Sequence, residues 1–207
     1  MPESVTALLV LWNDIDPELE TEYNWWHAHE HVPERCTVPG IMWGRRYRQR
    51  LLAGSPRYLT LYGLSNPDVM DSEPYQRLLQ EPTPTSRRMR PALRNVSRWL
   101  CWLRDFSETD EGNHLTFWTA MQQSNDALAE RSKWLDAHGI SLHFSAERIP
   151  EARPLPWMTE GQHLGIEGNW LMAADVGGIE AQLQLQLQLQ LQLQAQFGAI
   201  HYERLGS

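Results

Sequence analysis

The sequence predicts an α+β fold in which two βαββαβ units follow one another and pack their antiparallel sheets face to face as a barrel. Two observations support this prediction. The order of apolar runs, helix signals and turns over residues 5–105 recurs over residues 113–205. Each unit would also leave one sheet face apolar once its helices are placed, and bringing the two faces together buries both. We therefore divide the chain into repeats at 1–108 and 109–207.

Apolar and alternating runs define the strands of the first repeat, which we expect at residues 5–14, 41–52, 58–64 and 96–103. Asp16 and Pro17 suit the start of a helix, and Pro33 and the Pro39-Gly40 pair are expected to close it. A second helix is expected over residues 68–79, before a Pro-Thr-Pro-Thr interruption and a basic turn.

The second repeat follows the same order with weaker signals. Its strands are expected at residues 115–121, 140–149, 164–176 and 199–205. A first helix would begin at Asn125, and the slot of the second helix falls on residues 179–197. This slot contains strict Gln-Leu alternation from Gln182 to Gln194, which has the period of a strand and low complexity. Because leucine and glutamine both favour helices and the repeat order requires one, we predict an outer helix there.

The composition excludes several classes of partner. With 207 residues, 42% hydrophobic and 21% charged, the chain can bury an ample core. Its ten tryptophans favour dense packing or a cavity walled by rings. A net charge of −8 argues against nucleic acid or an anionic membrane as a partner, because both attract basic surfaces. We find no targeting segment, membrane span or cysteine framework around Cys36 and Cys101, so we expect a cytoplasmic protein.

Residues 23–40 hold the densest chemistry in the chain, with three histidines, two glutamates and an arginine among aromatic side chains. Helical spacing divides these residues between two faces. The predicted inner face carries Tyr23, Trp26, His27, Glu30 and His31, and the outer face carries Trp25 and His29. A carboxylate in an aromatic stripe is costly to bury without a partner. For Glu30 we expect Arg35 or an arginine of the next strand.

The next strand carries several arginines in alternation. Ile41, Trp43, Arg45 and Tyr47 are expected on one face, and Arg46, Arg48 and Arg50 on the other. One of these rows must face either the helices or the lumen. An arginine in a tryptophan-rich lumen would bind a carboxylate or enolate oxygen. The alternative is a structural arginine, for example one paired with Glu30.

A set of short motifs, which includes this helix, extends over roughly residues 5–105. They are Tyr23-Asn24-x-Trp26-His27-x-x-Glu30-His31-x-Pro33-Glu34-Arg35, Pro39-Gly40, Arg45-Arg46-Tyr47, Tyr58-Leu59-x-Leu61-Tyr62, Ser72-x-x-Tyr75 and Pro82-Thr83-Pro84. This set resembles a bacterial family within the dimeric α+β barrel superfamily, near the EthD-like proteins. The second half resembles the superfamily only in its order of elements.

The resemblance implies two ferredoxin-like units that form a barrel within one chain, so two equivalent sites are not expected. It also implies a ligand site in the lumen between the sheets. Superfamily members include muconolactone isomerases, cofactor-independent quinol monooxygenases, polyketide cyclases and haem-binding peroxidase relatives, so the fold does not settle the reaction. Within the Glu-His-x-Pro motif, the resemblance marks His31 as functional, and it brings no assigned reaction.

The candidate site residues all have a structural alternative. The candidate catalytic residues are His31, Glu30, His27 and Arg45, and the candidate substrate-binding residues are Tyr23, Trp26, Arg35, Trp43, Tyr47 and Tyr62. As alternatives, His31 could suit the negative end of its helix, the aromatic residues could be core, and Arg35 could pair with Glu34 in a loop.

Two classes of function remain. In the first, the chain is an isomerase, cyclase or monooxygenase that acts on a small cyclic or aromatic compound in the lumen, with His31 as general acid or base. In the second, a non-catalytic barrel binds a hydrophobic metabolite or a protein partner. An unpaired polar group in the lumen would favour the first class, and a lumen filled by tryptophans the second. The sequence leaves open whether the chain forms a homodimer.

We predict neither a cofactor nor a metal site. His27 and His31 have the i, i+4 spacing of two metal ligands, but no clear third ligand follows. Haem held by His27, His31 or His201 is a weaker alternative, because the sequence contains no haem-attachment motif.

Overall fold

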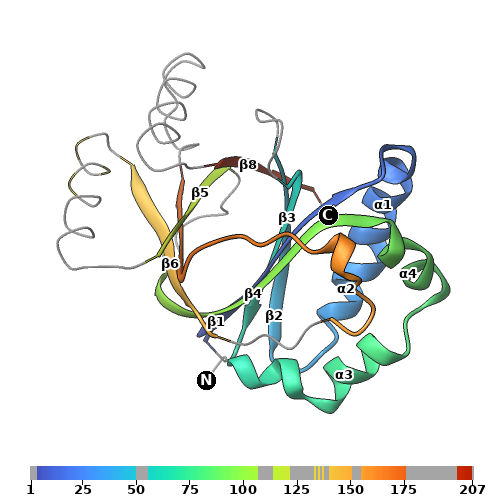
Figure 1. Ribbon diagram of the computed structural model, residues 1–207. Coiled ribbons are helices and arrows are strands. Elements are labelled where there is room, and N and C mark those ends of the chain that lie inside the picture. The colour runs from blue at the N-terminus through green and yellow to red at the C-terminus, as the bar shows by residue number, and fades with distance from the viewer. Residues whose placement is uncertain are drawn as a thin grey trace.

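The computed structural model describes residues 4–49, 56–106, 114–121, 140–150, 155–175 and 200–206, together with residues 133, 135 and 137. Within these residues, antiparallel strands form a closed barrel in the order β1-β3-β2-β8-β5-β7-β6-β4 (Figure 1). The strands are β1 (Ala7–Ile15), β2 (Ile41–Gln49), β3 (Tyr58–Leu64), β4 (Leu93–Phe106), β5 (His114–Ala120), β6 (Ser141–Arg148), β7 (Trp170–Asp175) and β8 (Ile200–Leu205). The predicted α+β barrel is confirmed.

The strand order is the same in the two halves of the barrel. Strands β1 to β4 lie in the order β4-β1-β3-β2, and β5 to β8 lie in the order β8-β5-β7-β6. Pairing of β2 with β8 and of β4 with β6 joins the two groups at both edges. No strand edge is left open in this barrel, which removes the hazard of edge-to-edge association.

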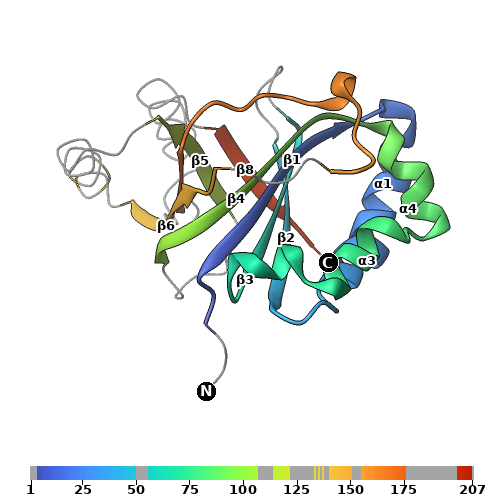
Figure 2. The same ribbon diagram turned by 60° about the horizontal axis from the view of Figure 1, so that its bottom comes forward.

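The described helices of the first half lie outside the barrel. They are η1 (Pro17–Leu19), α1 (Glu20–Trp26), η2 (His27–His31), α2 (Val32–Arg35), η3 (Pro67–Asp71), α3 (Glu73–Gln80), α4 (Pro84–Met89) and η4 (Arg90–Ala92). Figures 1 and 2 show α1, α3 and α4 gathered on one outer side of the barrel. The predicted Gln-Leu helix at 179–197 and the predicted helix from Asn125 lie outside the described residues, apart from isolated positions of the latter.

Alternation along the strands gives the barrel wall an inner and an outer face. On β1, Leu8, Val10 and Trp12 belong to the cluster that fills the lumen. Ala7 and Leu9 of the same strand belong to a separate cluster under the helices. Successive side chains of a strand point to opposite faces, so the parity of a residue decides whether it meets the lumen or the helices.

The sequence predicted that Pro33 helps to close the first helical segment, but the helix continues past Pro33 to Arg35. It passes from α1 through η2, a π-helical turn, into α2. Proline has no N–H to donate, and in an α-helix its ring would clash with the carbonyl four residues earlier. The wider turn before Pro33, in which the Val32 N–H donates to the His27 carbonyl, accommodates the ring. Such turns are frequent at functional sites.

Two other predicted elements differ from the structure. The Pro-Thr-Pro-Thr segment does interrupt the helices, since α3 ends at Gln80, but a further helix, α4, follows where only a basic turn was predicted. Thr83 caps α4, and a proline suits its first turn. The strand predicted over 164–176 begins only at Trp170. Gly168 has a φ of +132°, and a Cβ there would lie 2.9 Å from the Thr119 Cβ, so only glycine fits. Residues 164–168, which were predicted as part of this strand, form an irregular segment instead.

A bulge between Ile41 and Trp43 changes the expected alternation at the start of β2. Ile41 packs outward with the cluster under the helices, whereas Trp43 packs against the inner cluster. The two residues therefore do not share a face, contrary to the prediction. From Trp43 onward the predicted alternation holds, with Tyr47 inward and Arg46 outward.

Gly63 of β3 allows the Trp43 ring to lie directly on the neighbouring strand. A Cβ at Gly63 would lie 2.4 Å from Trp43 Cε2, so Gly63→Ala must displace the ring. We expect a loss of about 1–3 kcal/mol in the free energy of unfolding, or roughly 2–10 °C in melting temperature. Gly161→Ala is the matched control, because nothing lies within 4 Å of its added methyl. Equal melting temperatures for the two variants would contradict this packing.

Candidate active site

The histidine-rich helix packs its inner face on the outer face of the sheet. Tyr23 and Trp26 are buried there, each with 1% of its surface exposed. On the opposite side Trp25 is 58% exposed and stacks on His29, with ring centroids 5.3 Å apart. The predicted division of this helix into an inner and an outer face is confirmed.

His27 and His31 lie side by side on the inner flank, with ring centroids 5.0 Å apart. The Trp26 ring lies 4.6 Å from His31, and the Tyr23 ring lies 5.1 Å from His27. The Nδ1 atoms of both histidines are buried and have no hydrogen-bond partner among the described residues. Buried polar atoms in proteins are nearly always hydrogen-bonded, so two adjacent exceptions call for an explanation.

Both histidines line a small cavity of about 40 Å³, which we call the histidine pocket. Its other polar lining residues are Asn13, Thr60, Tyr62 and Arg90. The Tyr62 hydroxyl also lacks a hydrogen-bond partner among the described residues. A volume of this size holds two or three water molecules or a small polar group of a ligand. The unpartnered atoms therefore lie where such a group would meet them.

Three buried arginines from different elements act on the two histidines: Arg90 lines the histidine pocket, and Arg35 and Arg46 lie close enough for their charges to affect the rings. Arg46 of β2 donates to the side-chain and backbone oxygens of Asn24, at 2.9 and 3.3 Å. Arg90 donates to two backbone carbonyls of α3, both at 3.0 Å. Arg35 forms the predicted pair with Glu34, at 3.3 Å. No salt bridge joins Arg46 or Arg90 to a described carboxylate, so the surroundings of the pocket are positively charged.

These surroundings keep both histidines neutral. Burial lowers the pKa of His27 and of His31 well below the ordinary value of 6.5, and the nearby guanidinium charges lower it further. Arg46 has the larger effect on His27, and Arg35 on His31. Burial also raises the pKa of the Tyr62 hydroxyl and lowers the pKa of Arg90 to about 10. At neutral pH the imidazoles are therefore uncharged, the tyrosine is protonated and the arginine is charged.

Glu30 does not pair with an arginine, which corrects the sequence prediction. Its carboxylate accepts hydrogen bonds from the hydroxyls of Thr83 and Ser86, at the start of α4. Ser86 also accepts a hydrogen bond of 3.1 Å from the Trp26 indole nitrogen. The partners come from a helix that the sequence prediction omitted, so the prediction assigned the charge of Glu30 to the wrong neighbour.

The sheet separates the candidate residues into two groups. Tyr62 lines the histidine pocket, whereas Trp43 and Tyr47 pack into the lumen. Arg45 shares their parity, and its guanidinium lies 4.5 Å from the Trp43 ring. The predicted meeting of His31 with a ligand in the lumen is therefore corrected: the helix that carries His31 packs on the other face of the sheet.

Arg90 and Trp157 also line the histidine pocket, although neither is a predicted site residue. Ser86, Met89 and Arg90 are all buried and follow the i, i+3, i+4 spacing of an inner helical face, a pattern present in the sequence. Trp157 comes from the connection between β6 and β7, which reaches the helical side of the barrel in both views (Figures 1 and 2). No local pattern indicates that long-range contact.

Haem does not fit the histidine pocket, which is far smaller than the pockets of about 300–1,000 Å³ that hold drug-sized ligands. His201, the third haem candidate, lies 3.3 Å from the Thr116 hydroxyl through its Nδ1 atom. Within the described ranges, no group of three or more histidine, cysteine, aspartate or glutamate side chains is arranged to hold a metal ion.

Solved structures similar to this one share its fold over nearly the whole chain. An anthrone oxidase-like protein has a TM-score of 0.57 at 10% identity, covering 99% of this chain and 93% of its own. A candidate chlorite dismutase has a TM-score of 0.54 at 11% identity, covering 98% and 96%. A candidate monooxygenase from Lactobacillus acidophilus has a TM-score of 0.50 at 7% identity, covering 97% and 94%. The chain therefore shares its α+β barrel fold with these proteins.

Other comparisons are negative. No model of a known protein family matches the sequence, and no curated protein is detectably similar to it. In the part of the chain that the structure describes, no helix is long and apolar enough to span a membrane.

The lowered histidine pKa values predict a pH dependence of stability. Because the folded pKa lies below the unfolded value of about 6.5, the unfolded chain takes up protons first as the pH falls. The free energy of unfolding should therefore decrease below about pH 6.5, by up to about 1.4 kcal/mol per pH unit for each histidine.

Chemical denaturation of wild type and His31→Gln at several pH values measures this dependence. The difference between the two curves isolates His31 from the carboxylates, which titrate in both proteins. His29→Gln is the matched control, because it changes an exposed histidine of the same helical segment. If the His31→Gln and wild-type curves remain parallel from pH 7 to pH 5, the imidazole of His31 is not held neutral.

Proposed function

We propose that this chain is an enzyme of the monooxygenase-like α+β barrel class, which removes a proton from a small cyclic or aromatic compound without an organic cofactor. The observation that supports this proposal is the pair of neutral histidines with unpartnered Nδ1 atoms, close to the charges of three buried guanidinium groups. A histidine pair used only for packing does not need two ring nitrogens without partners.

Proton abstraction would use a neutral imidazole as the base. The His31 ring accepts the proton of an acidic C–H or O–H group, the N–H bond forms, and the electron pair of the broken bond remains on the substrate as an enolate or phenolate. His27 lies beside His31 and is also neutral, so it adds no charge that opposes the transfer. A positioned acid or base contributes typically 10²–10⁴-fold to a rate.

The arginines would stabilise the anion that remains. Arg46 and Arg90 are buried and form no salt bridge with a described carboxylate, and a buried charge without a direct ion pair is unfavourable until a counter-charge arrives. An anionic oxygen in the histidine pocket supplies that charge, and its attraction offsets the burial of the imidazolium that forms at the same time. The stabilising charge is thus in place before the reaction starts.

The anion can react further in two ways. As a monooxygenase, the chain would let the electron-rich anion reduce molecular oxygen, the second substrate, so that a CH2 group becomes a carbonyl with one oxygen atom and the other oxygen atom leaves as water. As an isomerase or cyclase, it would return the proton to another atom or close a ring. The names of the anthrone oxidase-like and monooxygenase-like neighbours support the first of these reactions, although at 7–11% identity the comparison itself extends only to the fold.

An aromatic substrate needs more room than the histidine pocket offers. Trp157 is half-buried over the pocket and lies near Arg90, with the guanidinium 5.7 Å from its ring. Gln162, further along the same connection, donates to the carbonyl of Arg90 at 3.0 Å. We propose that displacement of the Trp157 ring, with the connection still held by Gln162, admits the substrate from the helical side.

We also propose that 1–108 and 109–207 are tandem repeats of one EthD-like, ferredoxin-like unit, and that the enzyme acts in the cytoplasm as a monomer or a homodimer. The shared strand order of the two halves supports the repeat. Only the first half carries the histidine motif, so one reaction site is expected in each chain.

The role of His31 is tested by deuterium exchange under argon, with anthrone and the smaller ketone 2-tetralone as probes in deuterated buffer. Both have acidic protons beside a carbonyl or ring system, so exchange reports proton abstraction without oxidation. We expect His31→Ala to reduce the enzyme-catalysed exchange rate by ~10²–10⁴ while the melting temperature changes by only a few degrees. His29→Ala serves as the control and should keep the wild-type rate.

Two results would contradict the proposal. One is the absence of catalysed exchange with both probes. The other is a His31→Ala protein that loses thermal stability but retains the wild-type rate in its folded fraction, as a purely structural histidine would.

A further inference from the structure

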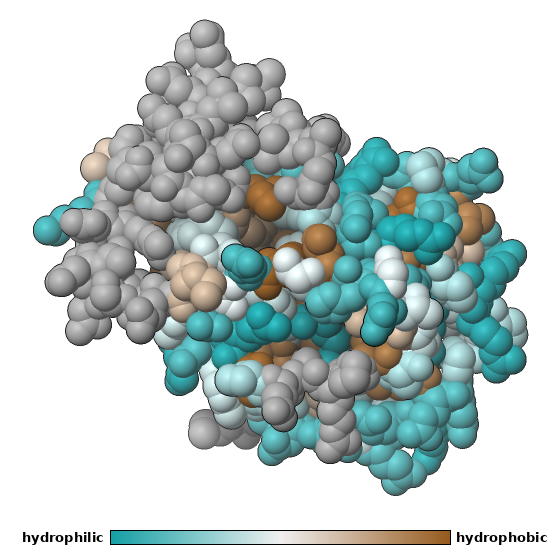
Figure 3. All heavy atoms as spheres, viewed as in Figure 1, coloured by the Kyte–Doolittle hydropathy of each residue, from teal (hydrophilic) through white to brown (hydrophobic). Residues whose placement is uncertain are grey.

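A second cavity lies inside the barrel, on the opposite side of the sheet from the histidine pocket. It has a volume of about 210 Å³ and lies where β1 ends and where β3 and β8 begin. The residues that line it are Trp12, Pro56, Phe117, Trp118, Thr119, Leu164, Ile166, Leu171, Ile200 and Tyr202. Figure 3 shows apolar side chains at the floor of a hollow near the middle of this face. We call this space the lumen cavity.

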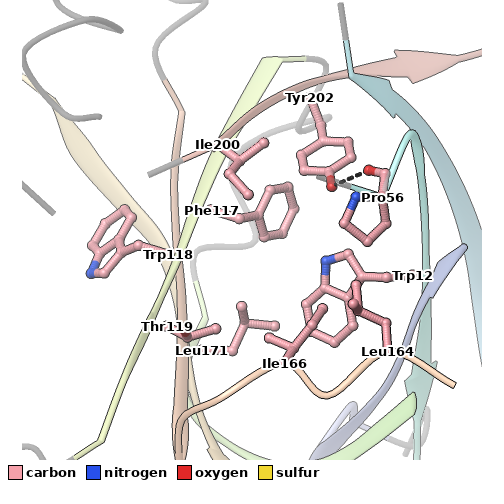
Figure 4. Close-up of a pocket in the computed structure, with 10 residues that line it drawn as sticks. All are labelled: Trp12, Pro56, Phe117, Trp118, Thr119, Leu164, Ile166, Leu171, Ile200 and Tyr202. Atoms are coloured by element: carbon pink, nitrogen blue, oxygen red, sulfur yellow. Dashed lines mark hydrogen bonds between the residues drawn. The ribbon is translucent and has the colours of Figure 1, made fainter. Parts of the chain in front are cut away.

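Most of the side chains that line the lumen cavity are apolar, and no described residue that lines it carries a charge. Phe117 and Ile200 lie on one side of the cavity and Trp12 and Pro56 on the other, with Leu171 and Ile166 side by side (Figure 4). The hydroxyl of Tyr202 is already engaged, because it donates to the Pro56 carbonyl at 2.7 Å. An apolar cavity of about 150 Å³ can stay dry and accept a benzene ring. The lumen cavity therefore has room for a ring with a second ring or a short substituent.

A polar group of the lining is placed to recognise a ligand. The indole nitrogen of Trp12 points into the space between Phe117 and Tyr202 (Figure 4). It makes no hydrogen bond to a described residue, although only 4% of the Trp12 surface is exposed. An indole N–H is a donor only, so it selects a ligand that carries an acceptor such as a carbonyl or ether oxygen.

We propose that the lumen cavity is a binding site for an uncharged, compact one- or two-ring compound with a single hydrogen-bond acceptor, held by the Trp12 N–H. The site is separate from the proposed reaction site, because no histidine, arginine or carboxylate lines it among the described residues. It binds without reacting, since it contains neither a base nor a charge to stabilise an anion. The absence of a counter-charge also excludes carboxylates, whose burial costs several kcal/mol.

Titration calorimetry with three ligands of one ring system tests the chemistry of the site. We expect indane to bind and 1-indanone to bind about five-fold more tightly, because its carbonyl accepts the Trp12 hydrogen bond. We expect 1-indanecarboxylate to bind at least about 100-fold more weakly than 1-indanone. Equal binding of all three ligands, or no binding of indane and 1-indanone, would overturn the proposal.

Variants test the location. Ile166→Trp fills the cavity from its rim and should weaken indane binding by at least about ten-fold, whereas Glu167→Trp adds the same ring at the neighbouring exposed position and should leave it unchanged. Trp12→Phe removes the donor and should reduce 1-indanone binding to the level of indane, with indane itself little affected. Wild-type affinity in Ile166→Trp would place the ligand elsewhere and refute the assignment. His31→Ala should keep indane affinity, so this test and that of the proposed reaction can fail independently.

Discussion

Closure of the barrel is the constraint on which the rest of the structure depends. Pairing of β2 with β8 and of β4 with β6 leaves the sheet without an open edge, so every strand has one face toward the lumen and one toward the outside. On β1, Leu11 and Asn13 line only the histidine pocket, whereas Trp12, which lies between them, borders both this pocket and the lumen cavity. One layer of strands therefore separates the uncharged lumen cavity from the histidine pocket, which has charged surroundings.

In the outer space, the buried guanidinium groups and the two neutral imidazoles determine the electrostatics of the site. Arg35, Arg46 and Arg90 are each at most 7% exposed, and backbone or side-chain oxygens occupy part of their donor capacity. Their charge and the burial of the rings act in the same direction on His27 and His31, since both oppose protonation. Such strongly shifted histidines beside a cavity are typical of sites that move protons, and the same charges favour an anionic product.

The sequence predicted the barrel and its strands because apolar runs and turn signals are local. Residues 58–64 were predicted as a strand and form β3 with the same bounds. The sequence did not predict which residues meet in the histidine pocket, because these contacts join residues that are far apart in the chain. Glu30 meets Thr83, 53 positions away, and Trp157 reaches the pocket from the other half of the chain. The bulge at Ile41 and the π-helical turn before Pro33 each shift a register by one residue, which a periodic pattern cannot indicate.

Nitrogen-15 NMR of the imidazole rings tests the central claim most directly, because it reports the protonation state of each ring in the folded protein. At about pH 6 an ordinary histidine is mostly protonated. We expect His27 and His31 to show the signals of neutral rings at this pH, with an unprotonated nitrogen that shifts when an anionic oxygen compound binds. Imidazolium signals from either residue at pH 6 would contradict the account of a charged pocket that holds its bases neutral.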